Sequence, residues 1–556
     1  MAGERYRTAI LVDPDVRAVG IDQDALVTAL RGLGAGRTVL VPGLARHPEL
    51  LTGAVKASGA RRAVVVVPDC ERPTISELRM WGEAGGLAPL GVHLVALDIV
   101  RARRNPAERS AYAVRMVRAA MAALDAPGTA QAVRRPVGVS LSRRGLLSGR
   151  ATTWVPVVEI DALACLGTSR CGRCVQACPA DALQTPESVL GAPPVVDASR
   201  CQACSGCLDV CPSGALRLDG HDPGTLAQRL QALLQGGDGS AAPSLVIACH
   251  SAAAPVHHLG DRDGLPGWLV LEVACLGGIG SGWYLAALAA GARTVQVLPC
   301  DRCLDRGSLT RELHFSRSLL VALGDVDAAR RVGVLPAEGR RLGRALLAVD
   351  GLTALVDGTG TDRIPAPGAL ETSTRVASRV AAWAVAELQR ALGRSAGDRH
   401  RRPLVIQGEG APLGVPRAAQ GCTACGVCAR SCPTRALSLS AGLGSTELVL
   451  DPAACSGCRV CVGTCPEGVL DVVPGVDLDL LAGGCVPIAR VATPTCPDCG
   501  EIVLALPATV HLTSLPAALA SRCPGCRQAA LVASGPDPVC APIPDTSNAL
   551  HATRHR

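Results

Sequence analysis

The sequence predicts a multidomain protein of mixed α/β and α+β class. Three observations support this prediction of the fold class. The chain has 556 residues, two separate regions alternate short apolar runs with helical stretches, and cysteine recurs at fixed spacing in two further regions. At roughly 150 residues per domain, this length predicts several domains. The chain is 48% hydrophobic but only 2% aromatic, so we expect its cores to be built from alanine, valine and leucine.

The first of these regions, residues 1–135, is expected to be an α/β domain. Its four apolar runs are Thr8 to Val12, Arg37 to Val41, Ala63 to Val67 and Val92 to Leu97. Helical stretches lie between and after them, and Ala107 to Leu124 is the longest. Strands that alternate with helices favour a largely parallel sheet. A connection rich in proline, arginine and glycine follows, from Gln131 to Thr153.

A second α/β domain is expected over residues 244–395, with a cysteine directly after or within two residues of each predicted strand. The predicted strands are Leu245 to Ala248, Leu269 to Val273 and Thr294 to Leu298, and the cysteines are Cys249, Cys275 and Cys300. The carboxyl ends of parallel strands meet at one sheet edge, where α/β proteins place their sites. We therefore expect the three thiols to cluster there, under helices predicted at Leu309 to Leu323 and Thr374 to Leu392.

Sixteen of the 27 cysteines fall into four runs that end in Cys-Pro. Three runs follow the spacing Cys-x2-Cys-x2-Cys-x3-Cys-Pro, and the first run has five residues in its first gap. In chain order, the runs are Cys165, Cys171, Cys174 and Cys178; Cys201, Cys204, Cys207 and Cys211; Cys422, Cys425, Cys428 and Cys432; and Cys455, Cys458, Cys461 and Cys465.

This is the bacterial ferredoxin pattern, in which four thiolates hold a cubane [4Fe–4S] cluster. Two residues between cysteines let a tight loop place three thiolates around one corner of a cube. The proline lacks an N–H group and presets φ, so it directs the chain into a short helix. Structural zinc is the alternative, but four runs in two pairs favour iron. We predict two-cluster ferredoxin domains at 157–220 and 403–475, flanking the second α/β domain.

In two-cluster ferredoxins, the fourth cysteine of each run ligates the cluster of the other run. This rule predicts four ligand sets, and the widened first gap makes the set with Cys165 the least regular. The sets are Cys165, Cys171, Cys174 and Cys211; Cys201, Cys204, Cys207 and Cys178; Cys422, Cys425, Cys428 and Cys465; and Cys455, Cys458, Cys461 and Cys432.

The tail, residues 476–556, carries two further Cys-x2-Cys pairs, Cys496 with Cys499 and Cys523 with Cys526. Four thiolates in two such pairs fit a closed tetrahedral zinc site. We therefore expect a zinc-ribbon-like tail. A rubredoxin-like iron is the alternative, because iron accepts the same four-sulfur geometry. Cys485 and Cys540 receive no assignment.

Residues 244–360 resemble the iron–sulfur (delta) subunit of hydrogenases that deliver electrons to heterodisulfide reductase. The resemblance rests on Ala248-Cys249, Cys275-Leu276-Gly277-Gly278, Ala289 to Ala292 leading into Val295 to Leu298, Cys300-x2-Cys303, and the helix from Arg311 to Leu323. It implies a [2Fe–2S] cluster on Cys249, Cys275, Cys300 and Cys303. The family's second cysteine near the first is missing, since Ala252 and its neighbours stand there. His250, His257 and His258 are nearby nitrogen donors, which we expect on a surface loop.

The amino-terminal domain resembles the opening domain of the flavin subunit of heterodisulfide reductase. Val65 to Pro68 followed by Asp69-Cys70-Glu71-Arg72-Pro73-Thr74 matches a strand, a cysteine and a helix start, and Leu97 to Arg101 also fits. Val12-Asp13-Pro14 occupies the place of an early cysteine of that family. We expect a degenerate docking domain without a cluster. No Gly-x-Gly-x-x-Gly follows a strand, and Gly32, Gly34 and Gly36 are off-pattern, so no flavin is expected.

Charge and hydropathy exclude two classes of partner. The net charge is +7, but Lys56 is the only lysine and arginine is spread evenly, without aromatic residues for base stacking. We therefore expect no nucleic-acid binding. Met1 to Ala9 lacks an apolar segment, and no stretch reaches the roughly 20 apolar residues of a membrane span. Arg143-Arg144-x-Leu146-Leu147 resembles a twin-arginine signal but lies far from the amino terminus. Many thiols without an export signal favour a reducing cytoplasm.

These patterns predict an electron-transfer subunit with no substrate site of its own. No Ser/His/Asp set, no paired carboxylates beside a cysteine and no phosphate loop occur in the sequence. The expected role is to relay electrons between a dehydrogenase or hydrogenase partner and a heterodisulfide-reductase-like complex. The alternative is a ferredoxin-type protein that senses redox state or matures a metalloenzyme. The middle domain separates the two ferredoxin pairs in sequence, so we expect it to be the junction between them.

Overall fold

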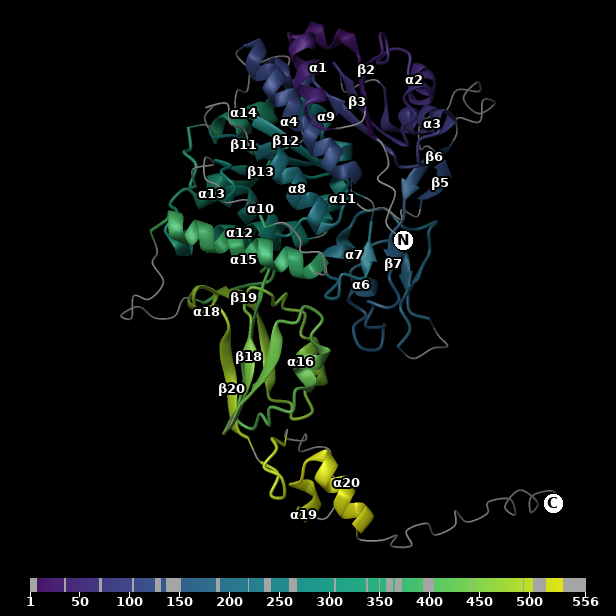
Figure 1. Ribbon diagram of the computed structural model, residues 1–556. Helices are drawn as coiled ribbons and strands as arrows, with labels where there is room; N and C mark the ends of the chain where they lie inside the picture. Colours follow the sequence, from purple (N-terminus) through teal and green to yellow (C-terminus); the bar gives the residue numbers. More distant parts are fainter. Residues whose placement is uncertain are drawn as a thin grey trace, which may run out of the picture.

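The structure is a computed structural model of the whole chain (Figure 1). It describes residues 8–34, 37–69, 73–102, 105–125, 132–136, 152–186, 191–218, 220–234, 242–259, 268–304, 307–336, 339–349, 351–356, 364–365, 373–393, 405–442, 444–493, 495–503 and 517–533. We refer to the N-terminal unit (8–125), the first cysteine unit (157–218), the middle unit (223–393), the second cysteine unit (405–492) and the tail.

The N-terminal unit is built on a four-stranded parallel sheet in the order β2-β1-β3-β4. The strands are β1 Thr8–Val12, β2 Thr38–Leu40, β3 Arg62–Val67 and β4 Val92–Ala96. Its α-helices are α1 Gln23–Arg31, α2 Leu50–Ser58, α3 Ile75–Gly85 and α4 Pro106–Asp125. The four predicted strands and the long helix are confirmed. One sheet face packs on α2 and α3, and the other packs on α1 and α4.

The middle unit repeats this strand order in a second parallel sheet, β12-β11-β13-β14. Its strands are β11 Ser244–Cys249, β12 Trp268–Val273, β13 Val295–Leu298 and β14 Val332–Val334. Its longer helices are α8 Pro223–Leu234, α10 Ser281–Ala289, α12 Ser308–Leu323, α14 Gly339–Ala348 and α15 Ser373–Ala391. Short helices are α9 Ala254–Leu259, α11 Asp301–Leu304 and α13 Ala328–Arg331. The three predicted strands and two predicted helices are confirmed.

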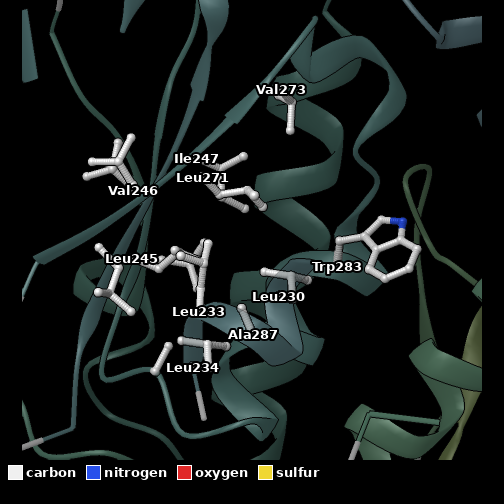
Figure 2. Packing of buried hydrophobic residues seen from close by; sticks show 14 of the residues in the cluster. Leu230, Leu233, Leu234, Leu245, Val246, Ile247, Leu271, Val273, Trp283 and Ala287 are labelled. Carbon is white, nitrogen blue, oxygen red and sulfur yellow. The ribbon is translucent and has the colours of Figure 1, made fainter. Parts of the chain in front are cut away.

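Helix α8 joins the two sheets. The sequence predicts a linker with one short helix at 220–243, but the leucines of α8 are buried in the core that the N-terminal and middle units share. Figure 2 shows Leu230 and Leu233 beside the strand residues Leu245 and Leu271. On the other side, α8 lies along α4. The two α/β units therefore share one continuous core.

The predicted connection Gln131 to Thr153 has structure at both ends. Strands β5 Ala132–Pro136 and β6 Thr152–Pro156 pair antiparallel. The indole N–H of Trp154 donates to Glu83 at 2.8 Å, which fixes this ribbon to α3. The ribbon thus anchors the N-terminal unit beside the first cysteine unit.

The described residues of the first cysteine unit form two-residue strands, in two antiparallel pairs, and two single-turn helices. The strands are β7 Glu159–Ile160, β8 Leu183–Gln184, β9 Val195–Val196 and β10 Leu216–Arg217, and the helices are α6 Arg173–Gln176 and α7 Gly206–Asp209. With so little regular structure, this unit depends on its loops and its neighbours for order.

The second cysteine unit has longer strands in two three-stranded antiparallel sheets, β15-β19-β16 and β17-β18-β20. Its strands are β15 Val405–Gln407, β16 Gly414–Ala418, β17 Leu437–Ala441, β18 Ser445–Leu450, β19 Leu470–Asp477 and β20 Val486–Ala492, and its helices are α16 Val427–Ser431, α17 Val460–Thr464 and α18 Leu478–Gly483. Residues 478–492 were expected in the tail, but β20 completes a sheet with β18.

The tail proper lies beyond β20, at the end of the second cysteine unit (Figure 1). Its described part contains α19 Ala517–Ala520 and α20 Pro524–Ala533, with an isolated bridge between Thr495 and Ile502. Among the described residues, no helix is long and apolar enough to cross a bilayer.

Candidate metal centres

Four cavities in the cysteine units are each lined by four cysteines. We call them sites 1 to 4; sites 1 and 2 lie in the first unit and sites 3 and 4 in the second. Site 1 is lined by Cys165, Cys171, Cys174 and Cys211; site 2 by Cys178, Cys201, Cys204 and Cys207; site 3 by Cys422, Cys425, Cys428 and Cys465; and site 4 by Cys432, Cys455, Cys458 and Cys461. These are the four sets that crossed ligation predicts, because each cavity takes its fourth cysteine from the other run.

Three positions in every run have left-handed backbone. They are two residues after the first cysteine, directly after the second, and three residues after the fourth. In the second run, they are Ala203 (φ 51°), Ser205 (φ 55°) and Gly214 (φ 64°). All six non-glycine residues of positive φ in the described part of the chain occupy such positions: Asp181, Ala203, Ser205, Ala424, Arg435 and Arg459. This conformation costs an L-residue roughly 1–2 kcal/mol, and such strain gathers at functional sites.

The widened gap of the first run leaves this pattern intact. Gly167 (φ 80°) and Gly172 (φ 61°) hold the first two left-handed positions, and the extra residues lie between them. A Cβ atom on Gly167 would come within 2.0 Å of the Gly191 carbonyl oxygen, so the loop packs closely on the segment before β9. The Gly167 N–H also donates to the Cys165 sulfur at 3.4 Å. The first run therefore keeps the local geometry of the regular runs.

Burial makes several of these cysteines poor acids without a metal. Desolvation, together with neighbouring thiols, raises the pKa of Cys174 and Cys428 to about 11 and that of Cys455 and Cys461 to about 12. Metal ligation requires thiolates, so binding must release these protons. A buried set of thiols therefore suits a metal group, because the positive charge of the metal takes the place of the released protons.

A further set of four cysteines lies at the carboxyl edge of the middle sheet; we call it the middle site. Cys249 ends β11, Cys275 and Cys300 follow β12 and β13, and Cys303 lies on α11. The Cys303 sulfur is 3.1 Å from that of Cys275, 3.5 Å from that of Cys249 and 3.7 Å from that of Cys300. Hydrogen bonds with Cys249 and Cys275 raise the pKa of Cys303. The expected convergence of thiols at this edge is therefore present.

The donors of the middle site fit an iron–sulfur cluster. Four thiolates hold a [2Fe–2S] cluster. Cys249, Cys300 and Cys303 have sulfur atoms within 4.8 Å of one another, which also suits a single metal ion. The N–H of Leu276 donates to the Cys249 sulfur and that of Gly277 to the Cys275 sulfur, both at 3.4 Å. Hydrogen bonds of this kind stabilise thiolate ligands and set cluster potentials.

His257, one of the histidines near the middle site, was expected on a surface loop, and this expectation is wrong. His257 lies on α9 and is 2% exposed. Its Nδ1 lies 3.0 Å from Asp98 of the N-terminal unit and its Nε2 lies 2.7 Å from Glu272. His250 is exposed and lies 2.9 Å from Glu272. The sequence missed this buried ion pair because Asp98 is distant in the chain.

The tail brings together the sulfur atoms of Cys496, Cys499, Cys523 and Cys526, all within 4.8 Å of one another. The Cys496 N–H bonds to Glu501 at 2.8 Å, and the Gly500 N–H bonds back to Cys496 at 2.9 Å. Desolvation opposes ionisation of Cys496, but N–H groups of Cys523, Asp498 and Cys499 outweigh it and lower its pKa to about 6. The set fits one tetrahedral metal ion with four sulfur ligands.

Four further features were singled out in the sequence. Cys485 is exposed. Cys70, Cys540 and the segment Arg143 to Leu147 lie outside the described residues.

Comparison with known families supports the two cysteine units. Residues 157–212 and residues 421–469 each match the model of a 4Fe–4S dicluster domain. No curated protein matches the sequence. The two dicluster domains imply four [4Fe–4S] clusters, and the protein has an iron–sulfur electron-transfer role.

Proposed function

We propose that this chain is a cytoplasmic electron-transfer subunit that relays electrons between a dehydrogenase or hydrogenase partner and a heterodisulfide-reductase-like complex. The observation that carries the proposal is the grouping of sixteen cysteines into four cavities, two in each of two adjoining units. Sites within a unit are close enough for their thiols to interact electrostatically. Burial raises the pKa of Cys207 in site 2, and the charge of Cys174 in site 1 adds to that rise. Closely spaced redox sites, in a sequence with no recognisable set of catalytic residues for a substrate, suit an electron relay.

Sites 1 to 4 would hold cubane clusters, the middle site a [2Fe–2S] cluster and the tail a zinc ion. When bound, the clusters supply reversible uptake of single electrons. The chain contributes burial and hydrogen bonds to sulfur. In the first unit, the Ala182 N–H donates to the Cys178 sulfur at 3.2 Å. Such bonds and the limited access of water set the potential at which each site accepts an electron.

The cofactor count tests this proposal most directly. Anaerobically purified full-length protein should contain about 18 irons, from four cubanes and one two-iron cluster, and about one zinc. A value near 20 would place a cubane in the middle site. Iron near eight with several zincs would overturn the relay. Anaerobic isolation from the native cell should also bring down catalytic dehydrogenase subunits; a chain that is always recovered alone would favour the sensing or maturation role.

Paired substitutions test the crossed ligation. Cys165→Ala with Cys211→Ala removes two ligands of site 1 and should cost about four irons. Cys201→Ala with Cys211→Ala removes two cysteines of one run but damages sites 2 and 1, so the loss should be about eight. The second unit offers the matched pairs Cys422→Ala with Cys465→Ala and Cys455→Ala with Cys465→Ala. The reverse order of losses within a pair, about eight irons for the first variant and about four for the second, would show that each run binds its own cluster.

A further inference from the structure

The two cysteine units contact each other directly, at residues next to their metal sites. Arg173 begins α6, between Cys171 and Cys174 of site 1. Its Nη1 donates to the carbonyl oxygen of Cys458, a site 4 residue, at 3.2 Å. One guanidinium thus bridges a ligand loop of each unit.

The middle site adjoins the opposite end of the first cysteine unit. The loop that follows Cys275 packs on Ser205 of site 2, and a Cβ atom on Gly278 would lie 2.2 Å from the Ser205 hydroxyl oxygen. Cys204 packs against the core that contains Cys249 and Cys275. The loop after Cys275 therefore packs directly against the lining of site 2.

From these two contacts we infer that the five cysteine sites form one row, in the order middle site, site 2, site 1, site 4, site 3, with Arg173 as the residue that couples the two cysteine units. This order rests on the proposed relay function and refines it. It also changes the expectation from sequence, because the middle unit ends the row and the first cysteine unit is the junction. The electron step is an exchange in which a singly reduced site loses one electron and its oxidised neighbour gains it.

The middle unit also touches the second cysteine unit, which defines a rival route. The Ser281 hydroxyl donates to the Gly410 carbonyl oxygen at 2.6 Å, and Arg311 lies 3.4 Å from Glu409. None of these residues is a neighbour in sequence of a metal-site cysteine, whereas Arg173 and Ser205 each adjoin one. We therefore place the electron path at Ser205 and Arg173.

Site-deletion variants of the full chain test the order. Cys455→Ala with Cys461→Ala removes site 4, and Cys422→Ala with Cys425→Ala removes site 3 from the same unit as the matched control. Electron paramagnetic resonance of the dithionite-reduced proteins reports how fast the spins of the first unit relax through neighbouring spins. Loss of site 4 should raise the relaxation time of the first unit's signals at least twofold more than loss of site 3. The middle-site signal should respond to neither.

Charge variants test Arg173 without removing a cluster. Arg173→Gln removes a positive charge beside sites 1 and 4, which disfavours an added electron. We expect the reduction equilibrium of one of these clusters to fall roughly tenfold, about 59 mV for one electron. Arg173→Lys keeps the charge and should restore most of the shift. Arg200→Gln is the control, because Arg200 also precedes a ligand cysteine but pairs with Asp181 of its own unit at 3.3 Å.

The outcomes separate this inference from the proposed function. If the wild type has the expected iron but deletion of site 4 and site 3 act equally, and Arg173→Gln leaves every potential unchanged, the row is wrong and the relay stands. A middle-site signal that responds to loss of site 4 supports the rival route at Ser281 and Gly410. If the wild type lacks the cubanes, the proposed function itself fails.

Discussion

The two parallel sheets have the same strand order, second-first-third-fourth, but different residues at their carboxyl ends. In the middle unit, the first strand ends in Cys249. In the N-terminal unit, Asp13 follows the first strand and is fully buried. It accepts hydrogen bonds from the N–H groups of Asp15 at 3.0 Å and Ala45 at 2.7 Å. The comparison shows that the sheet supplies only a place for a site, and the residues at its strand ends decide what that place does.

The two sheets are also joined at these ends. Asp98 follows β4, Glu272 lies on β12, and protonated His257 bridges them. Tyr112 of α4 accepts a hydrogen bond from the Val270 N–H at 3.2 Å nearby. The N-terminal sheet thus uses its strand ends for support, while the middle sheet uses its strand ends for thiols.

The largest expected difference between the two sheets is in metal content. Cys275→Ser should remove the middle-site iron, about two atoms for a [2Fe–2S] cluster, and its paramagnetic resonance signal, while the cubanes remain because each folds around its own thiolates. Iron analysis and spectra of the reduced protein measure this. Cys485→Ser, at an exposed cysteine, should change neither. An unaltered spectrum for Cys275→Ser would mean that these are ordinary buried thiols.

Breaking the junction between the sheets should cost stability and not iron. His257→Ala leaves Asp98 and Glu272 without their shared cation, and breaking a buried ion pair costs about 3 to 5 kcal/mol. Anaerobic thermal unfolding measures the loss. His47→Ala is the control, because His47 is exposed and pairs with exposed Glu49. Equal effects of the two substitutions would contradict the buried role of His257.

The same ion pair predicts a pH dependence. Desolvation disfavours the charged imidazole, but Asp98 and Glu272 outweigh it and raise the pKa of His257 to about 10. The unfolded value is about 6.5, so this stabilisation is complete below that pH and is lost as pH rises through about 10. Its steepest decline is about 1.4 kcal/mol per pH unit. The difference in stability between wild type and His257→Ala should therefore shrink between pH 7 and 10; a constant difference would contradict it.

A smaller effect on stability is expected at Asp13, the buried carboxylate that follows the first strand of the N-terminal sheet. Asp13→Ala leaves two partly buried N–H groups without their charged acceptor, which costs about 1.5 to 3 kcal/mol. Unfolding of the N-terminal unit, followed by hydrogen exchange in β1, measures it. Asp15→Ala removes only an exposed ion pair with Arg46 at 3.6 Å and should be close to neutral. A neutral Asp13→Ala would remove the supporting role assigned to this strand end.

The smallest effect on stability should be of equal size in the two α/β units. Gly59 ends α2 with φ 64°, and Gly324 ends α12 with φ 103°, each with open space where a Cβ would stand. Alanine at either position should cost about 1–2 kcal/mol, because an L-residue disfavours the left-handed region. Gly53→Ala, inside α2 and unhindered, should stabilise by about 0.4–1 kcal/mol. Thermal unfolding of the three variants shows whether each change lowers or raises stability as expected.

Much of this architecture is readable from the sequence because its signals are local. Cysteine spacing gives the four ligand sets, and β-branched runs give the central strands of both sheets. The burial of α8 is not readable, because its leucines serve two partners far apart in the chain. The pairing of β20 with β18, the His257 ion pair and the Arg173 contact with Cys458 are equally non-local. The spatial order of the sites therefore cannot be predicted from local sequence patterns and has to come from the structure.

The crossed cavities have a consequence for how the protein is made. Site 1 takes its last cysteine, Cys211, from a run that leaves the ribosome after the other three. Site 3 waits in the same way for Cys465. Until then the left-handed loop residues have no cluster to offset their strain, so metal insertion and loop folding must occur as one late event in each unit. A nascent chain that stalls between two runs would expose incomplete sets of thiols to oxidants, and delivery of clusters must therefore keep pace with translation.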